Sequence, residues 1–172
     1  MGIAIRSSES DARQLSRELR ESDDANMRRR RGVAALALVA AGAMGVIALY
    51  QLGIMKHLPE PSLRLLDADT VDASPDAYRW LDMPDSVLGF GSYAAPLALA
   101  SIGGPNRAER SPWLPLALAA KVGIDAAQAG RLAVVQWTRN RAFCSYCLVA
   151  AAATFATVPL VVPEARAALR HM

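Results

Sequence analysis

Hydrophobic and polar positions along this chain are gathered into long blocks. Three stretches contain no Asp, Glu, Lys or Arg, and they cover residues 32–55, 86–106 and 142–163. Each reaches the ~20 residues that a helix needs to cross ~30 Å of hydrocarbon. The pattern therefore predicts membrane-spanning helices, and a soluble protein with buried core helices is the weaker interpretation.

A fourth stretch, 112–137, has the right length but carries Lys121, Asp125 and Arg131. Lys121 and Asp125 are four residues apart, so on a helix they share one face and can pair. The charges either face the bundle or an interface, or they line a substrate or proton path, and we favour the first interpretation. With this stretch included, the sequence predicts an all-α integral membrane four-helix bundle with spans at about 33–55, 87–104, 113–135 and 143–163.

The charges between these spans predict how the bundle is oriented. Four consecutive arginines, residues 28–31, precede the first span and favour a cytoplasmic N-terminus. The long loop after that span, 56–86, has three basic and seven acidic residues, which fits the outer side. The turn at 105–111 and the tail each carry two arginines and fit the inside. We expect a multi-pass protein of a bacterial inner membrane with both termini in the cytoplasm.

The polar ends of the chain read as solvated segments. Residues 1–32 form a polar cytoplasmic segment, with a helix expected within 7–26 that is capped near Ser8 or Ser10. Residues 164–172 form a cytoplasmic tail. A cleaved signal peptide at the first span is the less favoured alternative to an uncleaved anchor, because the apolar stretch exceeds 7–15 residues. The basic charge is concentrated in the arginine run, and no nucleic-acid-binding patch is predicted.

The only two cysteines, Cys144 and Cys147, form a C-x-x-C at the start of the last apolar stretch. Two intervening residues on a helical turn bring both sulfurs within bonding reach, so the pair can cycle between dithiol and disulfide. A helix start, with Arg139 and Arg141 just before it, favours the reactive thiolate. At a membrane surface such a dithiol can exchange electrons with a quinone dissolved in the lipid.

Other roles for the two cysteines are weaker. A zinc site needs four ligands, and the only histidines, His57 and His171, lie far away in the sequence, so no metal is expected. Covalent haem attachment needs a histidine where Leu148 stands. A structural disulfide closing so small a loop stabilises little. The alternative to a redox role is that the two cysteines are small buried residues without a function.

Two motifs resemble those of the vitamin K epoxide reductase family. The first is Arg141-Ala-Phe-Cys-Ser-Tyr-Cys-Leu148, and the second is Met83-Pro-Asp-Ser-Val-Leu-Gly89 followed by Tyr93. The resemblance covers about residues 33–163. It implies a four-helix bundle around a quinone pocket, and reduction of a quinone or its epoxide coupled to thiol oxidation. In bacterial members this chemistry supports disulfide formation in exported proteins.

The resemblance also implies roles for individual residues. Cys144 and Cys147 would be the redox pair facing a menaquinone or ubiquinone. Asp85 stands where the family usually has an asparagine that hydrogen-bonds the quinone oxygen. Ser74 matches a loop serine near the substrate, and Tyr93 would belong to the same quinone-binding site.

One departure from the family concerns the outer loop. The family normally has two further cysteines there, which pass electrons from a partner to the C-x-x-C, and this loop has none. Asp69 stands near where the second would fall. Either a thioredoxin-like partner thiol reaches the C-x-x-C directly, or the protein is a non-catalytic membrane scaffold that binds a quinone, a lipid or a protein.

Overall fold

The computed structural model describes residues 9–172, and the regular elements of this part of the chain are helices joined by loops. Four helices are long: α2 (Ala25–Gln51), α4 (Asp85–Ser101), α6 (Trp113–Val135) and α7 (Ser145–Leu169). The shorter elements are α1 (Glu9–Glu21), α3 (Ala68–Asp72), α5 (Arg107–Arg110), a 3-10 turn η1 (Pro75–Tyr78) and a π-helical turn η2 (Gln136–Asn140). The all-α prediction is confirmed. The expected N-terminal helix is α1, and residues 7 and 8, including the candidate cap Ser8, lie outside the described residues.

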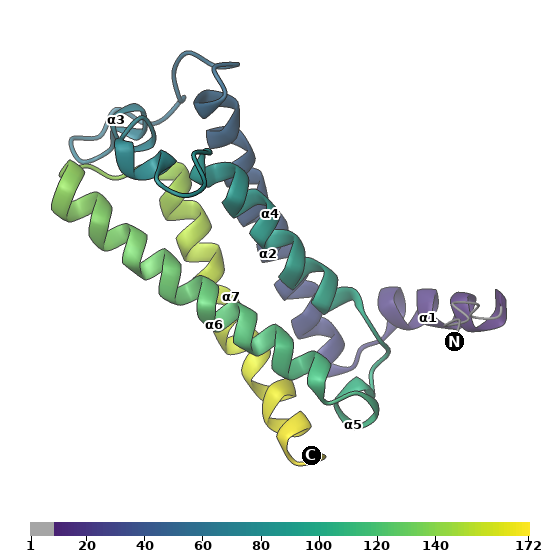
Figure 1. Ribbon diagram of the computed structural model, residues 1–172. Helices are drawn as coiled ribbons and strands as arrows, with labels where there is room; N and C mark the ends of the chain where they lie inside the picture. Colours follow the sequence, from purple (N-terminus) through teal and green to yellow (C-terminus); the bar gives the residue numbers. More distant parts are fainter. Residues whose placement is uncertain (1–8) are drawn as a thin grey trace.

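The four long helices run alongside one another (Figure 1). Helix α2 packs against α4 and α7, α6 packs against α7, and α4 has a smaller contact with α6. Buried apolar side chains from all four helices meet in one cluster, which comprises Val33, Ala100, Leu118, Val122 and Val161. Figure 1 shows α3 and the long loop at one end, and α5 and the C-terminus at the other.

Length and apolar composition make two of these helices, α2 and α7, able to cross a membrane. Large apolar side chains also point outwards on every long helix, among them Leu38, Val39, Phe90, Ile124, Val134, Val149 and Phe155. Lipid tails are as apolar as these side chains, so exposure to lipid costs them little. The bounds of α4 and α6 agree with the predicted spans 87–104 and 113–135 to within a few residues. Helix α7 starts close to the predicted position but continues past the predicted end at 163 to Leu169.

Helix α2 begins eight residues before the expected first span, because the arginine run is itself helical. Asp24 caps this start, and its carboxylate accepts hydrogen bonds from the backbone N–H groups of Asn26 and Met27. From its charge, the arginine run was expected only to keep the N-terminus in the cytoplasm. In the structure one of its members, Arg30, is buried with 3% of its surface exposed.

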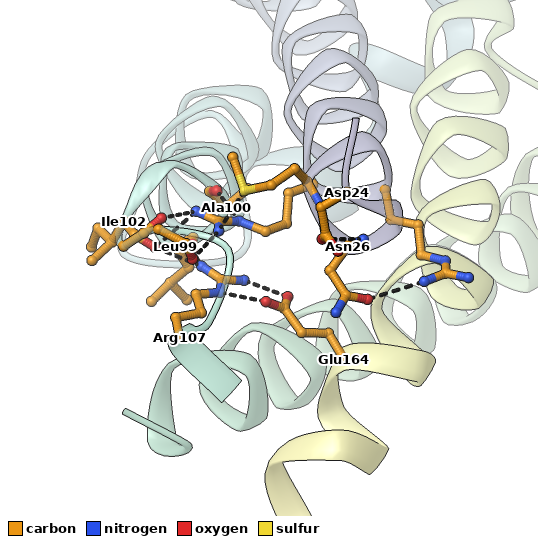
Figure 2. A network of polar contacts seen from close by, with 12 residues as sticks. Asp24, Asn26, Leu99, Ala100, Ile102, Arg107 and Glu164 are labelled. Carbon is orange, nitrogen blue, oxygen red and sulfur yellow. Dashed lines mark hydrogen bonds and ion pairs between the residues drawn. The ribbon is translucent and has the colours of Figure 1, made fainter. Parts of the chain in front are cut away.

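Arg30 is part of a polar network that we call the arginine clasp, formed by Arg30, Arg107 and Glu164 (Figure 2). Arg107 of α5 holds the Glu164 carboxylate of α7 with two parallel hydrogen bonds of 2.8 Å each. The Arg30 guanidinium donates to four backbone carbonyl oxygens at the end of α4, those of Ala100, Ile102, Gly103 and Gly104. The clasp therefore ties the ends of α2, α4 and α7 together through groups that satisfy one another.

The predicted pair on α6 is present. The Lys121 ammonium lies 2.5 Å from Asp125 and donates a 2.8 Å hydrogen bond to the Ser92 hydroxyl of α4. The side chains of Lys121 and Asp125 are 23% and 12% exposed, so both face the neighbouring helices. Both charges therefore face the bundle, as the favoured interpretation expects. Asp125 and Arg131 also line a cavity among the long helices, as the alternative of a substrate or proton path expects.

Candidate redox site

The long loop folds over the start of α7. Leu66 and Phe143 form an isolated parallel bridge, in which the Asp67 N–H donates to the Phe143 oxygen (3.0 Å) and the Phe143 N–H donates to the Leu65 oxygen (2.8 Å). The Tyr146 hydroxyl donates to the Pro59 carbonyl oxygen. These contacts hold α3 directly against the C-x-x-C.

Cys144 is the N-cap residue of α7, as expected from its place at the start of the apolar stretch. Its sulfur accepts a hydrogen bond from the Cys147 N–H (3.2 Å), one of the N–H groups that a helix start leaves without a helical partner. Its own N–H donates to the side-chain oxygen of Gln136 (3.2 Å). Cys144 is fully buried.

A carboxylate lies beside the two thiols. Asp72, the last residue of α3, has its Oδ1 atom 3.8 Å from the Cys147 sulfur, and one ligand-type atom of each of Asp72, Cys144 and Cys147 lies within 4.8 Å of the other two. Asp72 is 3% exposed, and its second oxygen, Oδ2, has no hydrogen-bond partner.

The surroundings of Asp72 favour its neutral form. Burial raises the pKa of Asp72 to about 7, and the nearby Asp85 and Glu60 carboxylates act in the same direction, while hydrogen bonds from the two thiols oppose the shift. Asp72 therefore changes its protonation state near neutral pH. A carboxyl group with this property beside two thiols can take up and release a proton.

A cavity of about 360 Å³ opens beside the cysteines. Its wall contains Cys147 and Asp72 together with Asp85 and Tyr93, whereas Cys144 does not line it. Apolar side chains from the long helices form part of the wall, including Met44, Ile47, Leu88, Leu132, Leu148 and Ala150. Further charged residues line it as well, namely Asp76, Arg79, Asp125, Arg131 and Arg139. Pockets of about 300–1,000 Å³ with apolar walls and a few polar groups are typical of small-molecule sites.

Two of the three residues expected to bind quinone line this cavity, each held by a neighbour. The amide nitrogen of Gln51 donates to the Asp85 carboxylate (3.0 Å), and the Tyr93 hydroxyl lies 3.0 Å from the hydroxyl of Thr154. Ser74 precedes η1, is half-buried and does not line the cavity. The structure thus brings Cys147, Asp85 and Tyr93 to one cavity and leaves Ser74 outside its wall.

The arginines before the C-x-x-C have other partners. Arg139 pairs with Asp76 at 2.7 Å, and the guanidinium carbon of Arg141 lies 5.8 Å from the centre of the Trp137 ring. The ring of Trp137 in turn stacks on Phe143. These contacts fasten the turn between α6 and α7, and Arg139 also lines the cavity.

Sequence reasoning missed Asp72 and Gln51. Gln51 ends α2, and besides Asp85 it reaches the backbone oxygen of Asp72 (3.0 Å). The signal for Asp72 was the spacing of Ala68, Val71 and Asp72, which are all buried on one face of α3. A carboxylate that shares a helical face with two apolar residues is a candidate for burial.

Asp72 and the two cysteines could together offer three ligand atoms to a metal ion. Closed structural zinc sites use four protein ligands. The group formed by Asp72, Cys144 and Cys147 has no fourth member in the part of the chain that the structure describes. Its geometry fits a dithiol with an adjacent carboxyl group better than a structural metal centre.

Comparisons with known proteins agree with the motifs. Residues 32–162 match the model of the vitamin K epoxide reductase family, which covers all four long helices except their outermost residues. A comparison with curated proteins found no match. The family consists of membrane proteins with thiol and quinone redox chemistry. The match spans most of the chain and includes the C-x-x-C and its cavity, and we conclude that the chain belongs to the vitamin K epoxide reductase family.

Proposed function

We propose that this protein is a membrane thiol–quinone oxidoreductase in which Cys144 and Cys147 cycle between dithiol and disulfide. The observation that carries the proposal is the position of Cys147, which lines a 360 Å³ cavity while its partner sulfur lies directly behind it. A menaquinone or ubiquinone ring would occupy the cavity. Asp85 and Tyr93 would hydrogen-bond the quinone oxygens, and Ser74 would contribute only if the loop moves.

The chemistry follows from the places of the two sulfurs. The Cys147 sulfur faces the cavity and bonds to an electrophilic carbon of the quinone. The Cys144 sulfur then bonds to the Cys147 sulfur, and the electron pair of the broken carbon–sulfur bond stays on the ring. Two thiols lose two electrons and two protons, and the quinone gains both, which yields a disulfide and a quinol.

Membrane placement completes the proposal. Four spans, α2, α4, α6 and α7, would cross a bacterial inner membrane, with both termini in the cytoplasm and the C-x-x-C at the outer surface. The new disulfide would then pass to exported proteins through a thioredoxin-like partner. Because the loop has no cysteine, the partner thiol must attack the C-x-x-C itself, and Cys147 is the more exposed of its two sulfurs.

The proposal is tested by following the two thiols in the purified protein with a thiol-reactive mass tag. Adding a menaquinone analogue to the reduced protein should remove both thiols together. Cys144→Ser and Cys147→Ser should each abolish the coupled oxidation, while Ser145→Ala, between them, should leave it unchanged. If both cysteine variants keep quinone-linked thiol oxidation, the proposal is wrong.

The second candidate, a non-catalytic scaffold, is favoured by the missing loop cysteines. It predicts that the double cysteine variant binds a quinone or a partner as the wild-type protein does. Thiols that stay reduced after quinone addition to the wild-type protein would support this candidate.

A further inference from the structure

The proposed reaction moves two protons as well as two electrons, and the proton path is not given by the C-x-x-C alone. When Cys147 bonds to the quinone, its thiol proton must leave towards a base, because the thiolate is the nucleophile. Several carboxylates line the cavity, those of Asp72, Asp76, Asp85 and Asp125, and only the Asp72 carboxylate has a hydrogen bond with the Cys147 thiol among the described residues. A base inside the site would therefore speed the step.

Asp72 is placed to be that base. Its Oδ1 atom lies 3.8 Å from the Cys147 sulfur, a distance that suits a weak thiol hydrogen bond. The same side chain lines the cavity, so it contacts both the thiol and the space for the quinone. Its Oδ2 atom is buried without a partner, an uncommon situation for a carboxylate and one that often marks a functional group.

We propose that Asp72 is a catalytic residue that takes the thiol proton of Cys147 as the sulfur attacks the quinone, and then returns it to a quinone oxygen. This inference rests on the proposed thiol–quinone function. The second quinol proton comes from the Cys144 thiol when its sulfur closes the disulfide. No further oxidant or reductant is needed, since the quinone accepts the electron pair and both protons.

The groups around Asp72 are compatible with this role. Asp85 of α4 and Glu60 of the loop add negative charge, and the two thiols of α7 are the remaining titratable neighbours that act on it. Its pKa of about 7 allows it to be an acceptor above neutral pH and a donor once protonated. The rate of quinone-linked thiol oxidation should therefore rise with pH through this region.

The test compares Asp72→Asn with the wild-type full chain in detergent. The rate of thiol loss after mixing with a soluble naphthoquinone is followed from pH 5.5 to 9. The variant should be slower by about 10²–10⁴-fold, the usual contribution of a general base, and should lose the rise near pH 7. Asp72→Glu should restore part of the rate. Asp82→Asn removes the same charge from an exposed loop position with a positive φ of 51°, which asparagine tolerates, and should behave as the wild type.

A second readout separates proton transfer from simple charge effects. If Asp72 acted only through its negative charge, its removal would make the thiolate easier to form and would speed both the quinone reaction and alkylation by iodoacetamide. Proton transfer predicts the opposite for both reactions, because the Cys147 proton must leave in each and Asp72 would accept it in each. Asp72→Asn reacting with the quinone as fast as the wild type, or faster, would overturn the inference while leaving the proposed function intact. A wild-type protein that does not react with the quinone would overturn both.

Discussion

Each end of this molecule buries a carboxylate, and the two carboxylates differ in whether their oxygens have hydrogen-bond partners. At one end Glu164 is held by two hydrogen bonds from Arg107, and both side chains are almost completely buried. At the other end Asp72 meets two thiols and two further carboxylates, and one of its oxygens has no partner. A network in which every polar group has a hydrogen-bond partner makes its end of the molecule rigid. A buried carboxyl group that lacks a partner can instead hold a proton that takes part in a reaction.

The largest expected effect comes from breaking the satisfied end. Arg107→Ala leaves the Glu164 charge buried without its partner, which typically costs about 3–5 kcal/mol. The thermal midpoint in detergent should fall sharply. Arg110→Ala removes an exposed arginine from the same short helix and should have little effect. Equal midpoints for the two variants would show that the clasp does not hold the helix ends together.

The same kind of measurement at the other end should give an effect of opposite sign. The folded pKa of Asp72, about 7, lies above the unfolded value of 3.8, so its contribution to stability is complete below about pH 4 and is lost as the pH rises through 7. The loss is of the order of 4 kcal/mol at pH 8 and above. Asp72→Asn, which stays neutral, should keep its stability over this range. The difference in free energy of unfolding between the two proteins, measured from pH 5 to 8.5, tests this expectation. Parallel pH profiles would contradict it.

A third expectation concerns the other half of the clasp. The planar guanidinium of Arg30 serves four carbonyl oxygens at once, which a lysine ammonium with three donors on a flexible stem cannot do. Arg30→Lys keeps the charge and should still lower stability by about 2 kcal/mol, the value of a hydrogen bond to a charged group. Arg28→Lys, at an exposed position of the same run, is the matched control. If both variants unfold alike, the arginine run acts through charge alone.

The helical fold and the C-x-x-C could be predicted because they depend on local patterns. Long apolar blocks predict helices, and the two cysteines are only three positions apart, so their place at the start of α7 follows from the sequence. The pair formed by Lys121 and Asp125 was found for the same reason, since an i,i+4 spacing is local.

The residues that sequence reasoning missed depend on contacts between distant segments. Asp72 and Cys147 are 75 positions apart, and Arg30 reaches carbonyls that follow it by 70–74 positions. One arginine in a run of four gives no local sign that it will be buried. For Asp72 the only local sign is its spacing from Ala68 and Val71 on the short helix α3. Only the packing of the loop on α7, and of α2 on α4, separates these residues from their neighbours.

The smallest expected effect tests whether hydrogen bonds also hold the end of the molecule that carries Asp72. Gln51 joins α2 to the backbone of Asp72, to the Asp85 carboxylate and to Ser86, whose hydroxyl donates to the Gln51 oxygen. These bonds involve a neutral amide, so Gln51→Leu should cost about 1 kcal/mol, less than either change in the clasp. Gln14→Leu, on exposed α1, is the control for replacing a glutamine by leucine. If Gln51→Leu lowers the free energy of unfolding as much as Arg107→Ala does, both ends are stabilised to a similar degree. The unsatisfied oxygen of Asp72 would then lie in a rigid part of the molecule.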